Sequence, residues 1–372
     1  MLTIPILDTA FRQQRLKSWQ PILTPKSVLP LLFLTTIIFT PLGIALLFTT
    51  YQVQDLVIDY SQCLQLADTD FADIPSKYVS KHFKSSSSKP QWRLVDSSSI
   101  TDDSTSFCQI QFEVPNDIKA PLYLFYKLTN FYQNHREYVN SFDYNQLQGV
   151  AVKPEDLSSD CSPLKTNSEG KAYYPCGLIS NSLFNDTFYT PELSNGTDSQ
   201  ITFTNAEISW SVDRSKYKKT KYDPSKIVPP PNWAKKYPDG YSSTNLPDIS
   251  TWYEFQVWMR TAGLPEFMKL ALKSENGTLA KGTYYINIES NFPVSIFGGT
   301  KSIVLTTSNA VGGRNVSLGV AYLIVAGLSI TFGIIFLIKY IIQPRKLGDH
   351  SYLNFDHHQD DNDSQPPLRQ IL

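Results

Sequence analysis

The chain has 372 residues, enough for one large domain or two of ordinary size. Its 33 lysines and arginines nearly balance its 34 aspartates and glutamates, which argues against a nucleic acid as the main partner. Charged residues make up 18% of the chain and aromatic residues 13%, and there are 24 prolines. This composition favours a loop-rich, strand-rich body over a helical bundle.

The chain begins with a basic segment, residues 1–27, followed by an uncharged apolar run over residues 28–50. The run is too long for the apolar part of a cleaved signal peptide, and no small-residue cleavage site follows it. We therefore predict a signal-anchor helix that stays in the membrane. Thr36, Thr40 and Gly43 share one face of this helix, which is typical of a surface that packs against another helix.

A second apolar run, residues 318–342, carries no charge before Lys339. At a rise of about 1.5 Å per residue it is long enough to cross a hydrocarbon core about 30 Å thick. Small residues recur near one stripe of it, where another helix could approach backbone to backbone. We interpret the stripe as the surface of a subunit that binds a partner, although glycine and alanine are common in membrane helices in any case. The stripe consists of Gly319, Ala326, Ser329 and Gly333.

The charges that flank the two runs predict the orientation of the chain. Basic residues precede the first run, whereas the only charged residues within 51–66 are Asp55 and Asp59, so the positive-inside rule puts the N-terminus in the cytosol. Basic residues at the end of the second run return the chain to the same side. Residues 51–317 are then luminal or extracellular. Residues 343–372 form a cytosolic tail whose composition predicts disorder.

Sequons for N-linked glycosylation support this orientation, because four of the five lie within residues 51–317. The fifth lies in the predicted cytosolic tail, where we expect it to stay unmodified. The four begin at Asn185, Asn195, Asn276 and Asn315. Asn315 stands close to the predicted bilayer, so we expect the other three to be the better acceptors.

All four cysteines also lie between the two apolar runs. An even number confined to one region indicates an oxidising compartment and disulfides. Three pairings are possible, and we favour neighbours in the sequence, Cys63 with Cys108 and Cys161 with Cys176. The second pair would close a loop of about 15 residues, a stabilisation of about 3 kcal/mol in the chain-entropy model.

Several runs between the apolar segments alternate apolar with polar residues, as half-buried antiparallel strands do. A helix is predicted over residues 252–261. Long proline-rich and serine-rich connections separate these runs, so we predict an antiparallel sheet or sandwich that carries large loops. The predicted strands are residues 108–114, 121–128, 200–204, 283–289 and 302–307.

Residues 214–236 combine eight basic residues with one acid, two tyrosines, a tryptophan and three successive prolines. One interpretation is a surface that docks on acidic loops of a partner or on anionic lipid headgroups. The other is a solvated face beside a stiff proline spacer. The sequence leaves both open.

The sequence contains no recognisable catalytic set. The predicted luminal segment has only two histidines, His82 and His135, too few for a convincing zinc site or triad beside disulfide-bonded cysteines. The usual hydrolase, metalloprotease and dinucleotide motifs are missing. We therefore predict no catalytic, cofactor-binding or metal-binding residues. Any energy-driven work must come from a partner.

Seven long motifs, spread from Phe11 to Phe355, resemble the cell division control protein fifty family, most closely its fungal members. They cover nearly the whole chain and are long enough to be specific. The motifs are FRQQRLKSWQPILTP (11–25), VQDLVIDYSQC (53–63), FYQNHREYVNSFD (131–143), YPCGLISNSLFNDTF (174–188), IVPPPNWAKKYPDGY (227–241), FGGTKSIVLTTSNAVGGRN (297–315) and QPRKLGDHSYLNFD (343–356).

The resemblance implies a non-catalytic accessory, or beta, subunit of a type IV P-type ATPase, a phospholipid flippase. Such a subunit forms a heterodimer with the catalytic chain and acts like a chaperone. The catalytic chain then folds, leaves the endoplasmic reticulum, and moves phospholipid from the exoplasmic to the cytosolic leaflet. The implied location is an integral membrane protein of the endoplasmic reticulum, Golgi, endosome or plasma membrane, with both termini in the cytosol.

Two other classes of protein share the predicted topology. A trimeric ligand-gated channel subunit also has two membrane helices and a large outer domain, but such domains are usually richer in cysteine. A pore helix should also show more polar residues than residues 318–338 offer. A membrane-anchored glycan-processing enzyme would need a luminal pair of carboxylates that the sequence does not locate.

Overall fold

The computed structural model describes residues 10, 11, 14–16, 24–96, 106–194, 201–308 and 312–344. The chain divides into two compact units. One contains two long helices and is called here the helix pair; the other, residues 48–316, is called the β domain. The sequon at Asn195 and the predicted C-terminal tail lie outside the described residues.

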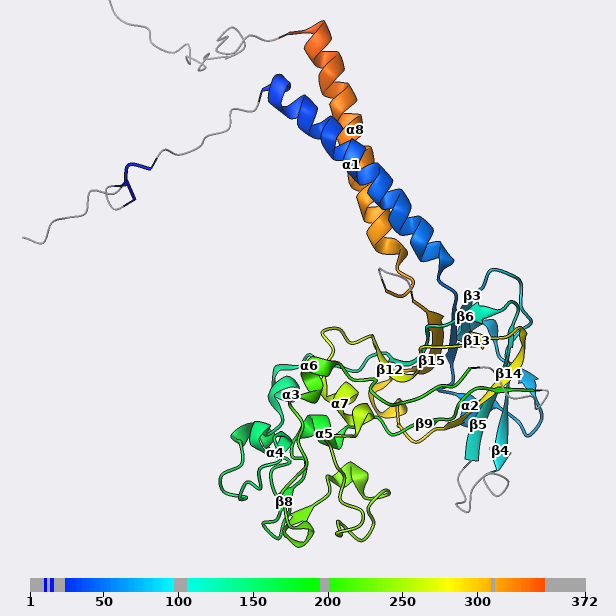
Figure 1. Cartoon of the computed structure of the whole chain (residues 1–372), viewed down its shortest axis with the longest axis vertical. Coiled ribbons are helices and arrows are strands. Elements are labelled where there is room, and N and C mark those ends of the chain that lie inside the picture. Colours follow the sequence, from blue (N-terminus) through cyan, green and yellow to red (C-terminus); the bar gives the residue numbers. More distant parts are fainter. Residues whose placement is uncertain are drawn as a thin grey trace, which may run out of the picture. The chain divides into compact units, whose positions relative to one another are not determined.

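The helix pair consists of α1 (Pro25–Gln52) and α8 (Val316–Ile342), drawn in blue and orange in Figure 1. Both are long and apolar enough, by length and composition, to cross a membrane. α1 continues without interruption through Pro30 and Pro41. The two predicted helices are therefore confirmed, and each is longer than predicted by a few residues.

The β domain is built on two antiparallel sheets. One has the order β12-β7-β15-β1-β3; the other has the order β10-β14-β5-β4-β2, with β9 also paired to β14. The strands of the first sheet are β1 (Asp55–Asp59), β3 (Val79–His82), β7 (Leu122–Leu128), β12 (Phe267–Ser274) and β15 (Lys301–Thr307). Those of the second are β2 (Ala72–Asp73), β4 (Gln91–Asp96), β5 (Ser106–Val114), β9 (Thr187–Phe188), β10 (Glu192–Leu193) and β14 (Gly282–Glu289).

Alternating side chains of both sheets fill one shared core. In β7 the residues Leu122 and Leu124 are buried and point to the same face. They share a hydrophobic cluster with Ile110 of β5 and Ile286 of β14, which belong to the other sheet. Because both sheets contribute to one core, the predicted antiparallel sandwich is confirmed.

A second core lies under the short helices and long loops of the β domain. Trp258 and Phe255 of α7 are fully buried there with Tyr174. Figure 1 shows these helices grouped beside the strand-rich part of the domain. The helices of this group are α3 (Arg136–Asn140), α4 (Tyr144–Leu147), α5 (Leu178–Asn181), α6 (Ser211–Arg214) and α7 (Tyr253–Met259), whereas α2 (Cys63–Leu66) packs against β4 and β5 of the sandwich. Two further strand pairs are β6 (Ile118–Lys119) with β13 (Thr278–Leu279) and β8 (Ala172–Tyr173) with β11 (Ile227–Val228).

One predicted strand is wrong. Residues 201–203 are not in a strand, and Thr204 makes only an isolated antiparallel bridge to Lys273. The alternation that suggested a strand is real, because Ile201 and Phe203 are buried in the sandwich core. It reports which side chains are buried, not whether the backbone pairs in a ladder. The helix predicted over residues 252–261 is confirmed in its central part as α7.

Candidate functional site

Glycines bring α1 and α8 into contact. A Cβ atom added at Gly319 would lie 2.8 Å from Cγ of Leu47 and 3.1 Å from its backbone nitrogen. One added at Gly43 would lie 2.9 Å from the side chain of Leu323 and 3.2 Å from the carbonyl oxygen of Gly319. Real Cβ contacts essentially never occur below 3.0 Å, so the helices approach this closely because these two residues are glycines.

Further contacts continue along the pair. The Thr36 hydroxyl donates to the Leu32 carbonyl in its own helix at 3.0 Å and lies 3.4 Å from the Ala326 carbonyl of α8. Phe39 and Tyr322 pack edge to face with ring centroids 5.0 Å apart. Contacts near the start of α1 involve the end of α8, and the reverse, so the two helices are antiparallel.

The small-residue stripe is thus occupied by the chain's own first helix. The buried residues of α8 are Gly319, Ala326, Ser329 and Gly333. On α1, Gly43 is buried, and Thr36 and Thr40 are half-buried. The sequence led us to assign these residues to the interface with a partner subunit. In the structure Gly43, Gly319 and Thr36 lie between the two helices of one chain. A contact of these residues with a partner subunit stays a prediction, and the opposite faces of the helices are further surface for a partner.

Those opposite faces are apolar. Leu34, Ile37 and Ile44 of α1 expose half or more of their surface, as do Ile324 and Ile335 of α8. Gly327 has no atom within 4 Å of an added Cβ and therefore lies on this outer side. These faces are available to lipid or to the helices of another membrane protein.

Two disulfides brace the β domain, and both follow the favoured pairing. Cys63 of α2 is bonded to Cys108 of β5, 45 residues apart in the sequence. Cys161 is bonded to Cys176, 15 residues apart. The first belongs to the sandwich core and the second to the core under the short helices. Each core is therefore crosslinked once.

The described sequon asparagines are all exposed. Asn185 lies in the loop before β9, Asn276 in the turn between β12 and β13, and Asn315 directly before α8. The backbone carbonyl of Asn315 accepts a hydrogen bond of 3.2 Å from the Thr50 hydroxyl. Their exposure is compatible with modification. Their occupancy stays a prediction.

Sequence reasoning missed a buried ion pair beside the first of these sequons. Asp186 and Lys301 are 115 residues apart, yet their side chains are 0% and 3% exposed and meet at 2.8 Å. The Asp186 carboxylate also accepts the Tyr60 hydroxyl at 2.8 Å and the backbone N–H groups of Asn291 and Phe292, each at 2.6 Å. Lys301 donates further to the Phe292 carbonyl at 2.7 Å.

This network stabilises the charges that it buries. Burial lowers the pKa of Lys301, and the charge of Asp186 acts in the opposite direction. Burial raises the pKa of Tyr60 well above its usual value, and Asp186 adds to that effect. A buried carboxylate with a lysine partner and three further donors has its charge compensated and its lone pairs used. No single sequence motif points to such a site, because its members come from four separate segments.

A second buried lysine, Lys269 of β12, binds the C-terminal end of α7. The Lys269 ammonium is buried and donates to the carbonyls of Val257 and Trp258, each at 3.0 Å, and to that of Arg260. These are carbonyls that the end of a helix leaves without partners. Burial, with a smaller effect from the charge of Arg260, lowers the pKa of Lys269 to about 7.

The basic segment at residues 214–236 packs through its aromatic residues. Tyr217 and Trp233 are buried in the core under the short helices, and the Tyr222 hydroxyl donates to the Val152 carbonyl at 2.7 Å. Lys218 and the other lysines of the segment are exposed. The aromatic residues are thus structural. The choice between a docking surface and a solvated face for the lysines stays open.

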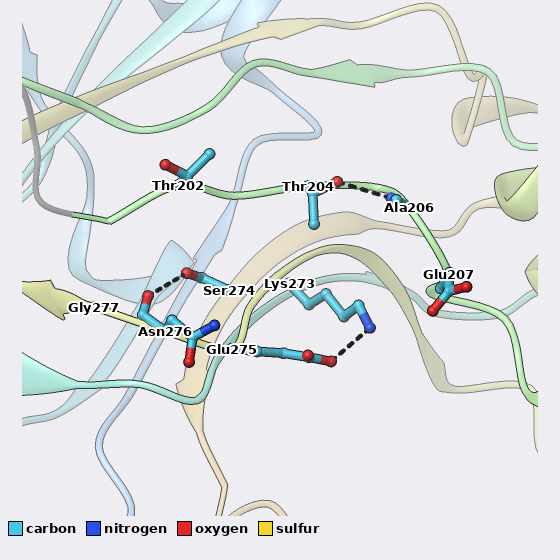
Figure 2. Close-up of a pocket in the computed structure, with 9 residues that line it drawn as sticks. All are labelled: Thr202, Thr204, Ala206, Glu207, Lys273, Ser274, Glu275, Asn276 and Gly277. Atoms are coloured by element: carbon cyan, nitrogen blue, oxygen red, sulfur yellow. Dashed lines mark hydrogen bonds and ion pairs between the residues drawn. The ribbon is translucent and has the colours of Figure 1, made fainter.

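In the described part of the β domain, two cavities have a sequon asparagine in their walls. The smaller, about 500 Å³, has Asn276 in its wall with the ion pair of Lys273 and Glu275, at 2.6 Å (Figure 2). The larger, about 830 Å³, has Asn185 in its wall. Within the described ranges, no group of three or more histidines, cysteines or acids is placed to hold a metal ion.

These features define a class: an integral membrane protein in which one apolar helix precedes, and another follows, a disulfide-braced antiparallel β domain in the sequence. The model of the LEM3 (ligand-effect modulator 3) family / CDC50 family matches residues 46–346, most of the chain. The chain belongs to this family.

Relatives with assigned names match this chain over nearly its full length. The chain is 50% identical over 371 residues to the phospholipid-transporting ATPase accessory subunit CRF1 of Saccharomyces cerevisiae, covering 98% of this chain and 93% of that protein. It is 41% identical over 360 residues to the accessory subunit LEM3 of the same yeast, covering 94% and 86%. It is 35% identical over 345 residues to cell cycle control protein 50A of Bos taurus, covering 89% and 88%. The yeast relatives are named as accessory subunits, which favours the subunit interpretation over a channel.

Proposed function

We propose that this chain is the accessory subunit of a P-type ATPase that transports phospholipid across a membrane. The observation that carries the proposal is the 50% identity, over 98% of the chain, to a protein named as such a subunit. The chain would form a heterodimer with a type IV catalytic ATPase. It would support the folding of that ATPase, its exit from the endoplasmic reticulum and its activity, while the ATPase moves phospholipid from the exoplasmic to the cytosolic leaflet.

The proposed topology has both termini in the cytosol and the β domain in the lumen or outside the cell. The charge distribution around the two helices supports it. The disulfides also support it, because stable disulfides belong to oxidising compartments. The proposed route runs from the endoplasmic reticulum to the Golgi, endosome or plasma membrane.

The mechanism we propose is stabilisation by binding. α1 and α8 use their glycine-containing faces on each other and keep apolar outer faces exposed. A polytopic ATPase that covers part of those outer faces would be stabilised in the paired state, since a ligand that binds only the folded form shifts the equilibrium towards it. Packing rather than the hydrophobic effect must drive this contact, because lipid tails are as apolar as the helices.

Copurification in mild detergent tests the proposal. The tagged full-length chain should recover one polytopic ATPase at about 1:1, and ATP hydrolysis by that pair should rise with one class of phospholipid headgroup. The chain purified alone should hydrolyse nothing. A stable homotrimer that carries ion current, or enzyme activity of the isolated chain, would contradict the proposal.

A further inference from the structure

The larger cavity of the β domain has the size and the lining of a small-molecule site. Its volume of about 830 Å³ falls in the range of about 300–1,000 Å³ that is usual for such sites. Eight aromatic residues line it, and four of their rings pack on one another: Tyr126 and Phe184 stack with centroids 4.0 Å apart, and Phe188 and Phe292 lie beside them. An aromatic lining with a few fixed polar groups is the general pattern of ligand pockets.

The polar side chains that line this cavity include five asparagines, two lysines and three acids. Asn291 connects several of them: its side-chain oxygen accepts from Lys235 at 2.9 Å, and its NH₂ group lies 2.9 Å from Glu289 and 3.4 Å from the carbonyl of Asn185. The backbone N–H of Asn232 donates to the side chain of Asn181 at 2.9 Å. These residues all line the cavity, so hydrogen-bonding groups are already held in place there.

Asn185 stands in the wall of this cavity and is the acceptor residue of a sequon. Its side chain is exposed, whereas Phe184 on one side is buried and the Asp186 carboxylate on the other is locked in the ion pair with Lys301. The backbone at Asn185 is therefore fixed from both sides. A group attached to its side chain would start from a defined point at the cavity.

We propose that this cavity is a carbohydrate subsite for the chain's own glycan, occupied by the innermost N-acetylglucosamine attached at Asn185. This sugar has an apolar ring face that suits aromatic side chains, and an acetamide and hydroxyls that suit amides and lysines. A diffusing ligand must be captured against its translational entropy, whereas a tethered sugar is already there at high effective concentration. The inference rests on the proposed luminal location of the β domain.

The cavity at Asn276 provides an internal contrast. Among the described residues that line it, shown in Figure 2, none is aromatic, and they include threonines, a serine and the exposed pair Lys273–Glu275. A sugar on Asn276 would find hydrogen-bonding groups there but no ring to pack on. We therefore expect the glycan at Asn276 to extend into solvent while the one at Asn185 is held.

The test measures how fast peptide-N-glycosidase cleaves the asparagine–sugar bond at each site in the native complex with its ATPase. Glycopeptide mass spectrometry, with ¹⁸O incorporated at each cleaved asparagine, reads the two rates in one sample. Cleavage at Asn185 should be at least tenfold slower than at Asn276, and the two rates should become equal after denaturation. Equal rates in the native complex would overturn the inference.

Variants distinguish the cavity from general crowding. The double variant Asn232→Ala with Lys235→Ala removes polar groups of the lining, and should raise the native rate at Asn185 at least fivefold without changing that at Asn276. Lys226→Ala, an exposed lysine of the same basic segment outside the lining, is the matched control and should change neither rate. Protection of Asn185 that persists in the double variant would also overturn the inference.

The same experiment separates this inference from the proposed function. If Asn276 is modified and Asn185 never is, the carbohydrate subsite is wrong and the luminal location stands. If no asparagine within residues 51–317 is modified in a glycosylating host, the proposed topology itself is wrong. A thermal shift adds a second readout: Asn185→Gln should lower the melting temperature of the complex, whereas Thr187→Ser, which keeps the sequon, should not.

Discussion

The helix pair and the β domain are stabilised in different ways. In the β domain two apolar cores, two disulfides and a buried ion pair all act within the chain. In the helix pair the specific contacts are few, and they centre on Gly43 and Gly319. In the most apolar stretches of α1 and α8 only 6% and 11% of the residues are buried. Nearly all of the remaining helix surface is left to lipid or to another protein.

This difference shows which part of the molecule depends on a partner. The β domain buries its apolar surface away from water and is crosslinked, so its stability is its own. The helix pair gains nothing from the hydrophobic effect inside a bilayer and relies on close packing. A partner that adds packing contacts would therefore matter most for the helices. The predictions below change one region at a time and measure the effect on it.

The largest effect is expected from Asp186→Ala. It leaves the Lys301 ammonium buried without its counter-charge, and breaking a buried ion pair costs about 3–5 kcal/mol. That is a large part of the stability of an ordinary domain, so most of the protein should fail to mature. The sequon at Asn185 is kept, because the residue between asparagine and threonine only has to differ from proline. Urea unfolding of the purified complex and its yield measure the effect.

Glu275→Gln is the matched control for Asp186→Ala. It removes the carboxylate of another lysine pair, Lys273–Glu275, whose Glu275 side chain is 63% exposed. Exposed pairs contribute about 0–1 kcal/mol, so its yield should match that of the unaltered protein. Equal stability of the two variants would contradict the assignment of the buried pair as a structural centre.

Removing the disulfides should cause the next largest loss of stability, and the loss should be greater for the bond that closes the longer loop. In the chain-entropy model a loop of 45 residues is worth about 4 kcal/mol and one of 15 residues about 3 kcal/mol. The double variant of Cys63 and Cys108 to serine should therefore be less stable than that of Cys161 and Cys176. Urea unfolding under non-reducing conditions checks the order. Two variants as stable as the unaltered protein would show that the bonds do not stabilise the β domain.

Leucine substitutions at three glycines of α8 should weaken its pairing with α1 to different extents, depending on how closely each glycine approaches α1. Gly319→Leu forces a side chain against the backbone of Leu47 and should cost about 1–3 kcal/mol of pairing. Gly333→Leu should cost less, since an added Cβ would lie 3.6 Å from the Phe33 ring, an ordinary contact. Gly327→Leu faces away from α1 and should leave the pair intact.

Two readouts separate the faces of α8. The thermal inactivation temperature of the detergent-solubilised complex reports the helix pair, and recovery of the ATPase reports the partner surface. Gly319→Leu should lower the first, while the β domain keeps its disulfides. Loss of ATPase recovery with Gly327→Leu alone would place the partner on that outer side. No difference among the three variants would mean that α1 and α8 do not pair through this stripe.

Sequence reasoning predicted well the features that depend on neighbouring residues. The two apolar helices, the alternation of β5, β7 and β14, and the pairing of cysteines adjacent in the sequence all follow local patterns. The stripe on α8 was also found, because a seven-residue recurrence is visible in one helix. The sequence did not predict that α1 packs against this stripe, because a row of small residues suits a helix of the same chain as well as a helix of a partner.

Features that depend on distant segments were missed. The pairing of Asp186 with Lys301 joins residues 115 apart, and in the sequence Asp186 is only the middle residue of a sequon. The run at residues 201–204 led to the opposite error, a strand that was predicted but is not present. Its apolar residues do alternate, but a strand also needs a partner backbone at the right distance, and a local pattern carries no information on that. Buried charges and strand ladders are both properties of the folded whole.

The smallest effect, and the most specific to the β domain, is a pH dependence from Lys269. Its pKa is about 7 in the folded protein, against about 10.4 for a free lysine, because the side chain is buried. Between these values the unfolded chain binds more protons than the folded one, so stability should rise as the pH rises. The slope is at most about 1.4 kcal/mol per pH unit, falls to about half of that at pH 7, and disappears as the pH falls further below 7.

Urea unfolding of the complex between pH 7.5 and 9.5 measures this slope. Lys269→Met should flatten it while keeping the length of the side chain, and the comparison is of slopes because the variant also removes a donor to three carbonyls. The buried tyrosines do not interfere in this window: burial raises the pKa of Tyr126 and Tyr174 further above 10, so their linkage begins only at higher pH and has the opposite sign. Exposed Lys226→Met is the control. An unchanged slope in Lys269→Met would mean that the folded β domain keeps this lysine charged across the whole window, with the three carbonyls compensating its burial.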